Sequence, residues 1–175
     1  MRFNVAQLLK EHSGETRQHT LHENIENLDP DITPLSTLDG TVMFIRTADG
    51  VLATGSLHCS IELACSRCLD LFSYPLRFTL EEEFRPTIDI STGATLPQLE
   101  DDEPATRIDA RHELDLTEVT RQDILLALPL HPICRTSCLG LCAQCGKNLN
   151  EGPCDCQPDH IDPRFEKLKE LLDKS

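Results

Sequence analysis

Six of the nine cysteines in this 175-residue chain fall within the 23 residues from Cys134 to Cys156. In this stretch Cys142-Ala-Gln-Cys145 is followed directly by Gly146. Two thiolates separated by two residues can turn back onto one metal ion, and the glycine relieves the tight turn. A similar pair, Cys65-Ser-Arg-Cys68, occurs much earlier in the chain. The spacing predicts a fold that bound metal stabilises, with Zn²⁺ in one or two structural sites.

Eight of the cysteines are enough for two sites of four thiolates each, with Cys59 left over as a buried thiol on the inward face of a strand. One site would be local in the sequence. The other would join distant parts of the chain and cost more loop-closure entropy. The division that we favour is Cys65, Cys68, Cys134 and Cys138 for the first site, and Cys142, Cys145, Cys154 and Cys156 for the second.

Other uses of these residues stay open. Cys134 or Cys138 could instead join the Cys142 pair, which would leave the Cys65 pair free. His131 lies three residues before Cys134 and could replace one thiolate. A redox role for the Cys65 pair would call for a helix N-terminus that lowers a thiol pKa, whereas the sequence predicts a strand hairpin there.

The pattern of apolar residues predicts an α+β fold: an antiparallel β-meander with a packed helix, then a C-terminal Cys-rich zinc-binding segment and a terminal helix. We expect an α+β domain over residues 1–133 with an acidic loop at 86–107. The metal-binding segment and the last helix, at 134–175, would pack on that domain.

The predicted meander consists of three strands. An apolar run at 42–45 leads to Asp49-Gly50, a strong hairpin signal. The return strand alternates from Leu57 to Leu63, and a third strand alternates from Phe72 to Leu80. Pro75 in the third strand predicts either an edge strand or a bulge. A polar strand over 16–25 and a short helix after Asn4 precede the meander.

Two helices are predicted after it. Asp115-Leu-Thr-Glu118 is similar to a capping box, and the helix that follows ends before Pro129. Its inward residues would be Leu116, Val119, Ile124, Leu125 and Leu128. The last helix begins at Asp162-Pro163, with an N-cap followed by proline at its first position. Its apolar face would hold Phe165, Leu168, Leu171 and Leu172.

The charge is −14 overall and unevenly placed. Residues 81–118 hold 12 acidic residues against 3 arginines, which accounts for −9 of it. Such a balance argues against nonspecific binding of polyanions, because phosphate contacts depend on Lys and Arg. The sequence has no apolar run of signal-peptide or transmembrane length, and an odd number of cysteines suits reduced thiols better than disulfides. We therefore expect a cytoplasmic protein without a membrane partner.

Catalytic motifs are not found. No histidine is followed by glutamate two residues later, and H-E-x-x-H, G-x-S-x-G and a phosphate-binding glycine loop are lacking. A catalytic zinc usually keeps an open position with histidine or carboxylate ligands, whereas the predicted sites are closed and all-thiolate. The sequence predicts a binding or assembly factor, neither an enzyme nor a binder of small substrates.

Three segments resemble the YceD family, the large ribosomal RNA subunit accumulation proteins. They are L-T-E-V-T-R-Q-D-I-L-L-A-L-P-L-H-P-I-C, then C-L-G-L-C-A-Q-C-G-K-N-L-N-E-G-P-C-D-C, and finally D-P-R-F-E-K-L-K-E-L-L. The earlier C-S-R-C-L-D-L-F and E-E-E-F are similar too. The resemblance covers residues from about Gly55 to Leu172 and includes the cysteine positions.

The resemblance implies a bacterial cytoplasmic factor that supports accumulation or processing of large-subunit (23S) ribosomal RNA, without catalytic activity. Its partner would be that RNA or its precursor particle. One alternative is an acidic chaperone or binding partner of a basic ribosomal protein, and another is a thiol redox or metal-sensing protein. Candidate contacts to RNA or a partner are Arg67, Arg135, Lys147, Arg164, Lys167 and Lys169.

Overall fold

The computed structural model describes residues 1–97 and 103–156. The chain forms two compact units, one of Met1–Leu63 with Leu71–Pro132, the other of Ala64–Asp70 with Ile133–Ser175. The helix predicted from Asp162 lies outside the described residues, as do Arg164, Lys167 and Lys169. The division into domains at residue 133 stays a prediction.

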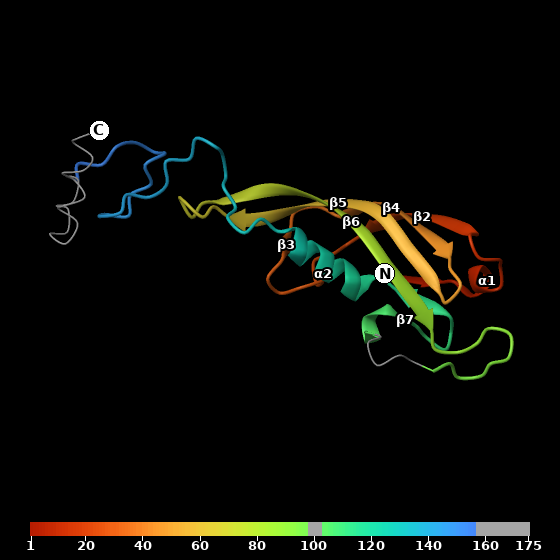
Figure 1. Cartoon of the computed structure of the whole chain (residues 1–175). Coiled ribbons are helices and arrows are strands. Elements are labelled where there is room, and N and C mark those ends of the chain that lie inside the picture. Colours follow the sequence, from red (N-terminus) through yellow and green to blue (C-terminus); the bar gives the residue numbers. More distant parts are fainter. Residues whose placement is uncertain (98–102, 157–175) are drawn as a thin grey trace, which may run out of the picture. The chain divides into compact units, whose positions relative to one another are not determined.

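A six-stranded sheet forms the frame of the first unit (Figure 1). The order along it is β2-β4-β5-β6-β7, with β3 also paired to β5. The predicted meander is confirmed, because β4, β5 and β6 are consecutive in the chain and adjacent in the sheet. The strands are β2 (Thr16–Glu23), β3 (Thr33–Pro34), β4 (Leu38–Arg46), β5 (Val51–Ala64), β6 (Leu71–Pro86) and β7 (Arg107–Ile108).

The sheet is mixed, which corrects the expectation of a purely antiparallel one. β7 pairs parallel to β6, with Arg85 opposite Arg107 and Pro86 opposite Ile108. A parallel partner requires a crossover, and the predicted acidic loop supplies it. That loop also carries structure of its own in its described part: a bridge between Ile88 and Thr95, and the 3₁₀ helix η1 (Pro104–Thr106). Two-residue strands have no periodicity by which a sequence could reveal them.

The turn between β4 and β5 forms at the predicted Asp49-Gly50. Arg46 pairs with Val51, and the Thr47 amide donates to the Gly50 carbonyl at 3.1 Å. A Cβ at Gly50 would lie 2.0 Å from the Phe84 carbonyl oxygen, so only glycine allows this turn to approach β6.

Alternation along β5 and β6 places the core as predicted. On β5, Leu57, Cys59 and Ile61 are buried, and burial raises the pKa of the Cys59 thiol. On β6, Leu76, Phe78 and Leu80 are buried. In the described residues, pairing of β7 with β6 is confined to the far end of β6, so Pro75 lies in a part of β6 that forms an edge of the sheet, as one of the two predicted alternatives has it.

A two-stranded sheet of β1 (Arg2–Asn4) and β8 (Glu113–Asp115) leads into helix α2 (Thr117–Ala127). This small sheet was not predicted. The short helix α1 (Ala6–Leu9) was predicted, with Asn4 as its cap. Its N-cap position is Val5, which makes no side-chain cap bond, although the Asn4 side chain accepts from the Ala6 amide at 3.1 Å.

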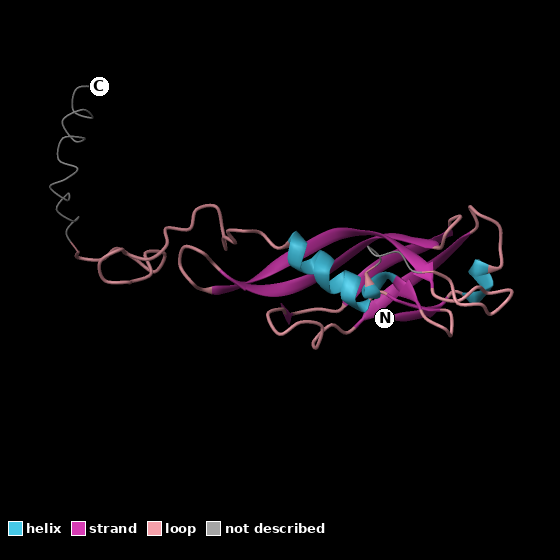
Figure 2. Cartoon of the chain, turned by 60° about the horizontal axis from the view of Figure 1, so that its bottom comes forward, coloured by secondary structure: helices cyan, strands magenta, loops and turns pink. Residues whose placement is uncertain are grey.

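Helix α2 packs against β6, and its ribbon lies along the magenta sheet in Figure 2. Leu116, Val119 and Ile124 are buried, and Leu125 and Leu128 pack on the core with part of their surface exposed. These are the five inward residues that the sequence predicts. In the described ranges, no helix is long and apolar enough to cross a membrane.

The predicted capping box does not form, because the N-cap position of α2 is Leu116, which makes no side-chain cap bond. Asp115 Oδ1 instead accepts from the Thr117 amide, two residues on, at 2.9 Å. Glu118 pairs with Arg121 at 2.7 Å, and Arg121 also reaches Asp29 at 2.8 Å. Burial disfavours the Asp115 carboxylate, but hydrogen bonds from Thr117 and Arg2 outweigh it and lower its pKa to about 2.

Candidate metal centres

The first group of four sulfurs joins the loop between β5 and β6 to the segment after α2. Sγ of Cys65 lies 3.8 Å from Sγ of Cys138, and Sγ of Cys68 lies 3.7 Å from Sγ of Cys134. All four sulfurs lie within 4.8 Å of one another. A tetrahedral zinc with Zn–S bonds of about 2.3 Å separates its sulfurs by about 3.8 Å, so the donor set and its spacing fit Zn²⁺. We call this set cluster 1.

The second group consists of Cys142, Cys145, Cys154 and Cys156, again within 4.8 Å of one another, and we call it cluster 2. The two clusters differ in exposure. Three cysteines of cluster 1 are buried, whereas Cys145 of cluster 2 is exposed and its other three members are half-buried. The sulfurs group as the favoured division predicts, and His131 belongs to neither described group. Metal in the two clusters stays a prediction.

The two C-x-x-C turns are built alike. In each, the first cysteine donates its amide to the carbonyl five residues later: Cys65 to Asp70 at 2.9 Å, and Cys142 to Lys147 at 2.8 Å. In each, the residue that follows the second cysteine donates back to the first cysteine at 2.9 Å. That residue has a positive φ, 64° at Leu69 and 72° at Gly146. Leu69 thus adopts the conformation for which the other turn uses glycine.

The segment after cluster 1 packs against the first turn within the same unit. Leu141 donates its amide to the Arg67 carbonyl at 3.0 Å, and Asn148 Nδ2 donates to Asp70 Oδ2 at 2.8 Å. Gly140 has a φ of 78°, and a Cβ there would lie 3.1 Å from the Arg67 oxygen. These bonds connect the first turn to the segment that follows Cys138.

Asn150 is a site residue that the sequence analysis missed. Its Nδ2 donates to Cys138 Sγ at 3.4 Å, and its Oδ1 accepts from the Leu139 amide and from Arg135 Nη2, both at 2.9 Å. The amide therefore orients a thiolate of cluster 1 from within the loop that leads to cluster 2. Asparagine carries no metal-ligand pattern, so the spacing of the cysteines could not reveal it.

Hydrogen bonds stabilise the thiolate form of two cysteines in cluster 1, Cys65 and Cys138. The Cys134 amide is the main cause that lowers the pKa of Cys65 to about 6, and the Asn150 side chain lowers the pKa of Cys138. At Cys68 an amide bond from Asp70 favours the thiolate, but burial and the Cys65 sulfur outweigh it and raise the pKa. Burial is the first cause of the raised pKa at Cys134.

In cluster 2, too, the pKa of one thiol is lowered and that of another is raised. Amide bonds from Cys145 and Gln144 lower the pKa of Cys142 to about 6, whereas the neighbouring Cys145 sulfur raises the pKa of Cys156 to about 12. In both clusters some thiols ionise readily and then oppose ionisation of the others. A bound divalent cation would offset the repulsion among the thiolates. A group of four such cysteines is therefore better suited to binding Zn²⁺ than to remaining as free thiols.

The described candidate cations Arg67, Arg135 and Lys147 are exposed and take part in the fold of the second unit. Arg67 Nη1 donates to the Cys138 carbonyl at 3.0 Å, and Lys147 Nζ donates to the Pro153 carbonyl at 2.7 Å. Together with the Arg135 bond to Asn150, these acceptors are carbonyl and amide oxygens. Among the described residues, none of these three hydrogen-bond acceptors is a carboxylate.

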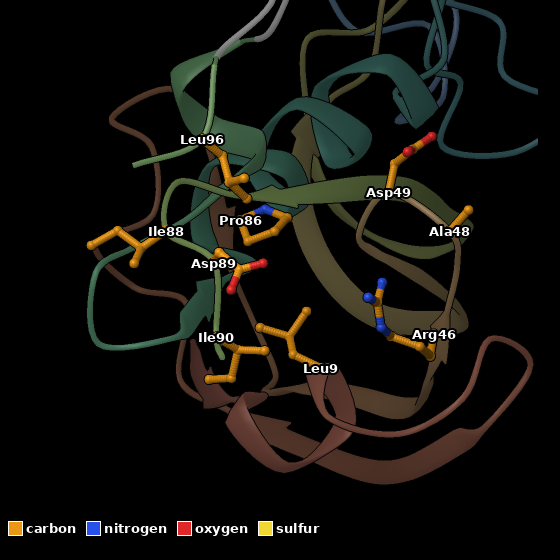
Figure 3. Close-up of a pocket in the computed structure, with 9 residues that line it drawn as sticks. All are labelled: Leu9, Arg46, Ala48, Asp49, Pro86, Ile88, Asp89, Ile90 and Leu96. Carbon is orange, nitrogen blue, oxygen red and sulfur yellow. The ribbon is translucent and has the colours of Figure 1, made fainter. Parts of the chain in front are cut away.

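A separate pocket of about 260 Å³ lies in the first unit (Figure 3). Arg46 lines it; its Nη1 donates to the carbonyls of Thr47 and Gly50, and its Nε is buried without a partner. None of the predicted site residues lines this pocket. Its lining consists of Leu9, Arg46, Ala48, Asp49, Pro86, Ile88, Asp89, Ile90 and Leu96.

Comparisons with known proteins agree with the resemblance noted in the sequence. An uncharacterised protein of Mycobacterium tuberculosis is 34% identical over 135 residues, which cover 77% of this chain and 62% of that protein. The chloroplastic large ribosomal RNA subunit accumulation protein YCED homolog 1 of Arabidopsis thaliana is 28% identical over 166 residues, covering 83% of this chain and 50% of that protein. The chain thus spans between half and two thirds of these relatives.

The search of solved structures gave no match. The family model described as large ribosomal RNA subunit accumulation protein YceD matches residues 53–172, a range that contains all eight cysteines of the two clusters. No catalytic activity is known for this family. The chain belongs to the YceD family.

Proposed function

We propose that the chain is a non-catalytic ribosome biogenesis factor of the bacterial cytoplasm. It would support accumulation or processing of large-subunit (23S) ribosomal RNA by binding that RNA or its precursor particle. The observation that carries this proposal is the family match over residues 53–172, because the family is named for accumulation of this RNA.

The chemistry of the clusters supports a non-catalytic role. Zn²⁺ bound to four thiolates is coordinatively full and leaves no position for a substrate or an activated water. A redox role for the Cys65 pair is less favoured, because Cys65 and Cys68 lie 3.8 and 3.7 Å from cysteines of a distant segment. Zn²⁺ would therefore stabilise the second unit.

Contact with RNA would use the cations of the second unit, Arg67, Arg135 and Lys147. Their exposure and their neutral partners support this, because a phosphate oxygen could approach each of them without competing with a carboxylate. Arg164, Lys167 and Lys169 would add a second basic patch.

The test is a pull-down of the tagged chain from growing cells, with the sample divided into RNase-treated and untreated halves before elution. Large-subunit precursor RNA is expected in the untreated half, with crosslinks to the second unit. A matched variant carries Arg67→Gln, Arg135→Gln and Lys147→Gln, which removes charge but keeps a donor for each carbonyl. It should lose crosslinks while its zinc content stays unchanged. Unchanged crosslinking would exclude this surface.

A second candidate function is binding of a basic ribosomal protein. Burial is the first cause that raises the pKa of Glu82, and the charges of Asp123 and Glu103 raise it further. Oδ2 of Asp123 is buried without a hydrogen-bond partner. These carboxylates repel one another in the free chain, and a cationic partner would relieve that repulsion.

The same pull-down separates the two candidates. A ribosomal protein that stays bound after RNase treatment, without RNA crosslinks, would favour the second. It should then be lost in a Glu82→Gln, Glu103→Gln variant and retained in the Arg67, Arg135 and Lys147 variant.

A further inference from the structure

A row of three polar side chains crosses the sheet of the first unit, over the neighbouring strands β2, β4 and β5 (Figure 1). His22 of β2 lies opposite Asp39 of β4, and Asp39 in turn lies opposite His58 of β5. Residues directly opposite each other in adjacent strands have Cβ atoms about 5 Å apart and side chains on the same face. The Asp39 carboxylate is therefore flanked by an imidazole on each side.

The row is accessible to solvent. Leu21 and Leu57, which precede the two histidines, are buried, so the alternation of the strands directs His22 and His58 to the opposite face. The side chain of His22 is 74% exposed and that of Asp39 is 36% exposed. His58 is exposed as well. A dissolved ion can therefore reach all three residues.

Hydrogen bonds already orient the Asp39 carboxylate. Its Oδ2 accepts from Thr37 Oγ1 at 2.7 Å, and its Oδ1 lies 2.5 Å from Nδ1 of His22. A neighbouring donor that fixes one carboxylate oxygen is typical of the residues that surround metal ligands. A metal ion can replace the proton between Oδ1 and Nδ1, because both atoms bind metal in their deprotonated form.

We infer that His22, Asp39 and His58 form a binding site for a divalent transition-metal ion such as Zn²⁺, separate from the cysteine clusters. Two imidazole nitrogens and one carboxylate oxygen suit Zn²⁺, whereas Mg²⁺ and Ca²⁺ favour oxygen ligands alone. Three protein ligands leave the fourth position of a tetrahedral Zn²⁺ open to water or to a donor atom of a partner.

Binding requires the ring of His58 to turn towards the other two ligands. Among the described residues, only the two cysteine clusters bring three or more such donor atoms within 4.8 Å of one another. His58 is exposed, so its ring can change rotamer without disturbing the core. A Zn–N bond of about 2.1 Å beyond the imidazole also lets this histidine reach across one strand spacing of about 4.8 Å.

The site was not visible in the sequence, because its three residues are brought together only by the register of three strands. Of the three, only His58 lies within the range that the family model matches, residues 53–172. The inference therefore depends neither on the family match nor on the proposed function.

The zinc content per chain tests the inference. The full-length chain and its variants are dialysed against the same micromolar concentration of free Zn²⁺ at neutral pH, and the bound metal is counted by mass spectrometry. The double variant His22→Ala, His58→Ala should hold one ion fewer per chain than the unchanged protein. Because this result is a difference, it does not depend on how many ions the cysteine clusters hold.

The matched control is the double variant His12→Ala, His131→Ala. It removes two other exposed histidines and should hold as much zinc as the unchanged chain. Asp39→Asn keeps the shape of the side chain but removes its charge, and should weaken binding of this ion at least about tenfold. In NMR spectra, the ring signals of His22 and His58 should shift when the ion binds, while those of His12 stay in place.

Four results would overturn the inference. The first is equal zinc content in the His22→Ala, His58→Ala variant and the unchanged chain. The second is an equal loss of zinc in the control variant. The third is unchanged affinity in Asp39→Asn, and the fourth is a ring signal of His22 or His58 that does not respond to Zn²⁺.

Discussion

At the scale of single residues, the two C-x-x-C turns differ in the residue with a positive φ. Leu69 occupies this position in the first turn and Gly146 in the second. An L-residue other than glycine costs about 1 to 2 kcal/mol in this conformation. The first turn tolerates that cost because Arg67 and Asp70 are bonded to the segment 140–148, whereas the second turn relies on glycine.

Gly146→Ala is therefore expected to weaken metal binding by cluster 2 about 5- to 30-fold, the equivalent of 1 to 2 kcal/mol of strain. A Cβ at this position meets nothing within 4 Å, so the backbone conformation alone carries the effect. Competition with a colorimetric chelator measures it. Gly93→Ala is the control, because Gly93 has a φ of 70° and open surroundings but lies far from the cysteines in sequence. Equal affinity in the two variants would contradict this account of the turn.

The lowered pKa of Asp115 predicts that its contribution to folding stability depends on pH. Its pKa is about 2, below the ordinary 3.8, so it stabilises the fold when ionised. This contribution is complete above about pH 4 and is lost as the pH falls towards 2. Asp115→Ala should lower the free energy of unfolding by about 1 kcal/mol at pH 7, as loss of the net contribution of a hydrogen bond does, and by much less at pH 2.5.

Urea unfolding followed by circular dichroism measures this difference at both pH values. Glu26→Ala, at an exposed position, is the control and should change stability little at either pH. A loss of the same size at pH 7 and pH 2.5 would show that Asp115 acts through packing and not through its charge.

At the scale of elements, exposure and hydrogen bonding separate the two clusters. Cluster 1 has three buried cysteines and a side-chain donor from Asn150. Cluster 2 has an exposed cysteine and lies within fifteen residues of sequence. A chelator reaches an exposed sulfur more easily, so the ion of cluster 2 should leave first.

Zinc release to an excess of chelator is expected in two phases of equal amplitude. Cys154→Ser should remove the fast phase and Cys68→Ser the slow one, because each takes away one of four ligands. Cys59→Ser should retain both phases, since that thiol lies in the core of the first unit. A single phase, or a fast phase that survives Cys154→Ser, would show that the clusters do not differ in this way.

The elements that the sequence predicts are those with a strong local signal. The β4–β5 hairpin follows from Asp49-Gly50, and the long strands β5 and β6 follow from alternation over many residues. The pairs β1–β8 and β6–β7 were missed because strands of two or three residues depend on tertiary partners that no window reveals. The grouping of the sulfurs was predictable from spacing, whereas the contribution of Asn150 was not.

At the scale of the whole molecule, the chain combines a first unit built on a sheet with a second unit built around eight cysteines. The acidic excess at residues 81–118 and the cations of the cysteine turns belong to different units. The two proposed surfaces therefore lie in different units and can be tested separately.

The proposed function requires intact cysteine clusters for large-subunit ribosomal RNA to accumulate. The most direct measurement is the ratio of large- to small-subunit ribosomal RNA in cells that lack the gene, complemented with variants expressed at equal levels. Deletion should lower the ratio. The unchanged chain and Cys59→Ser should restore it, while Cys65→Ser with Cys138→Ser should not. An unchanged ratio on deletion, or full restoration by the cluster variant, would contradict the account.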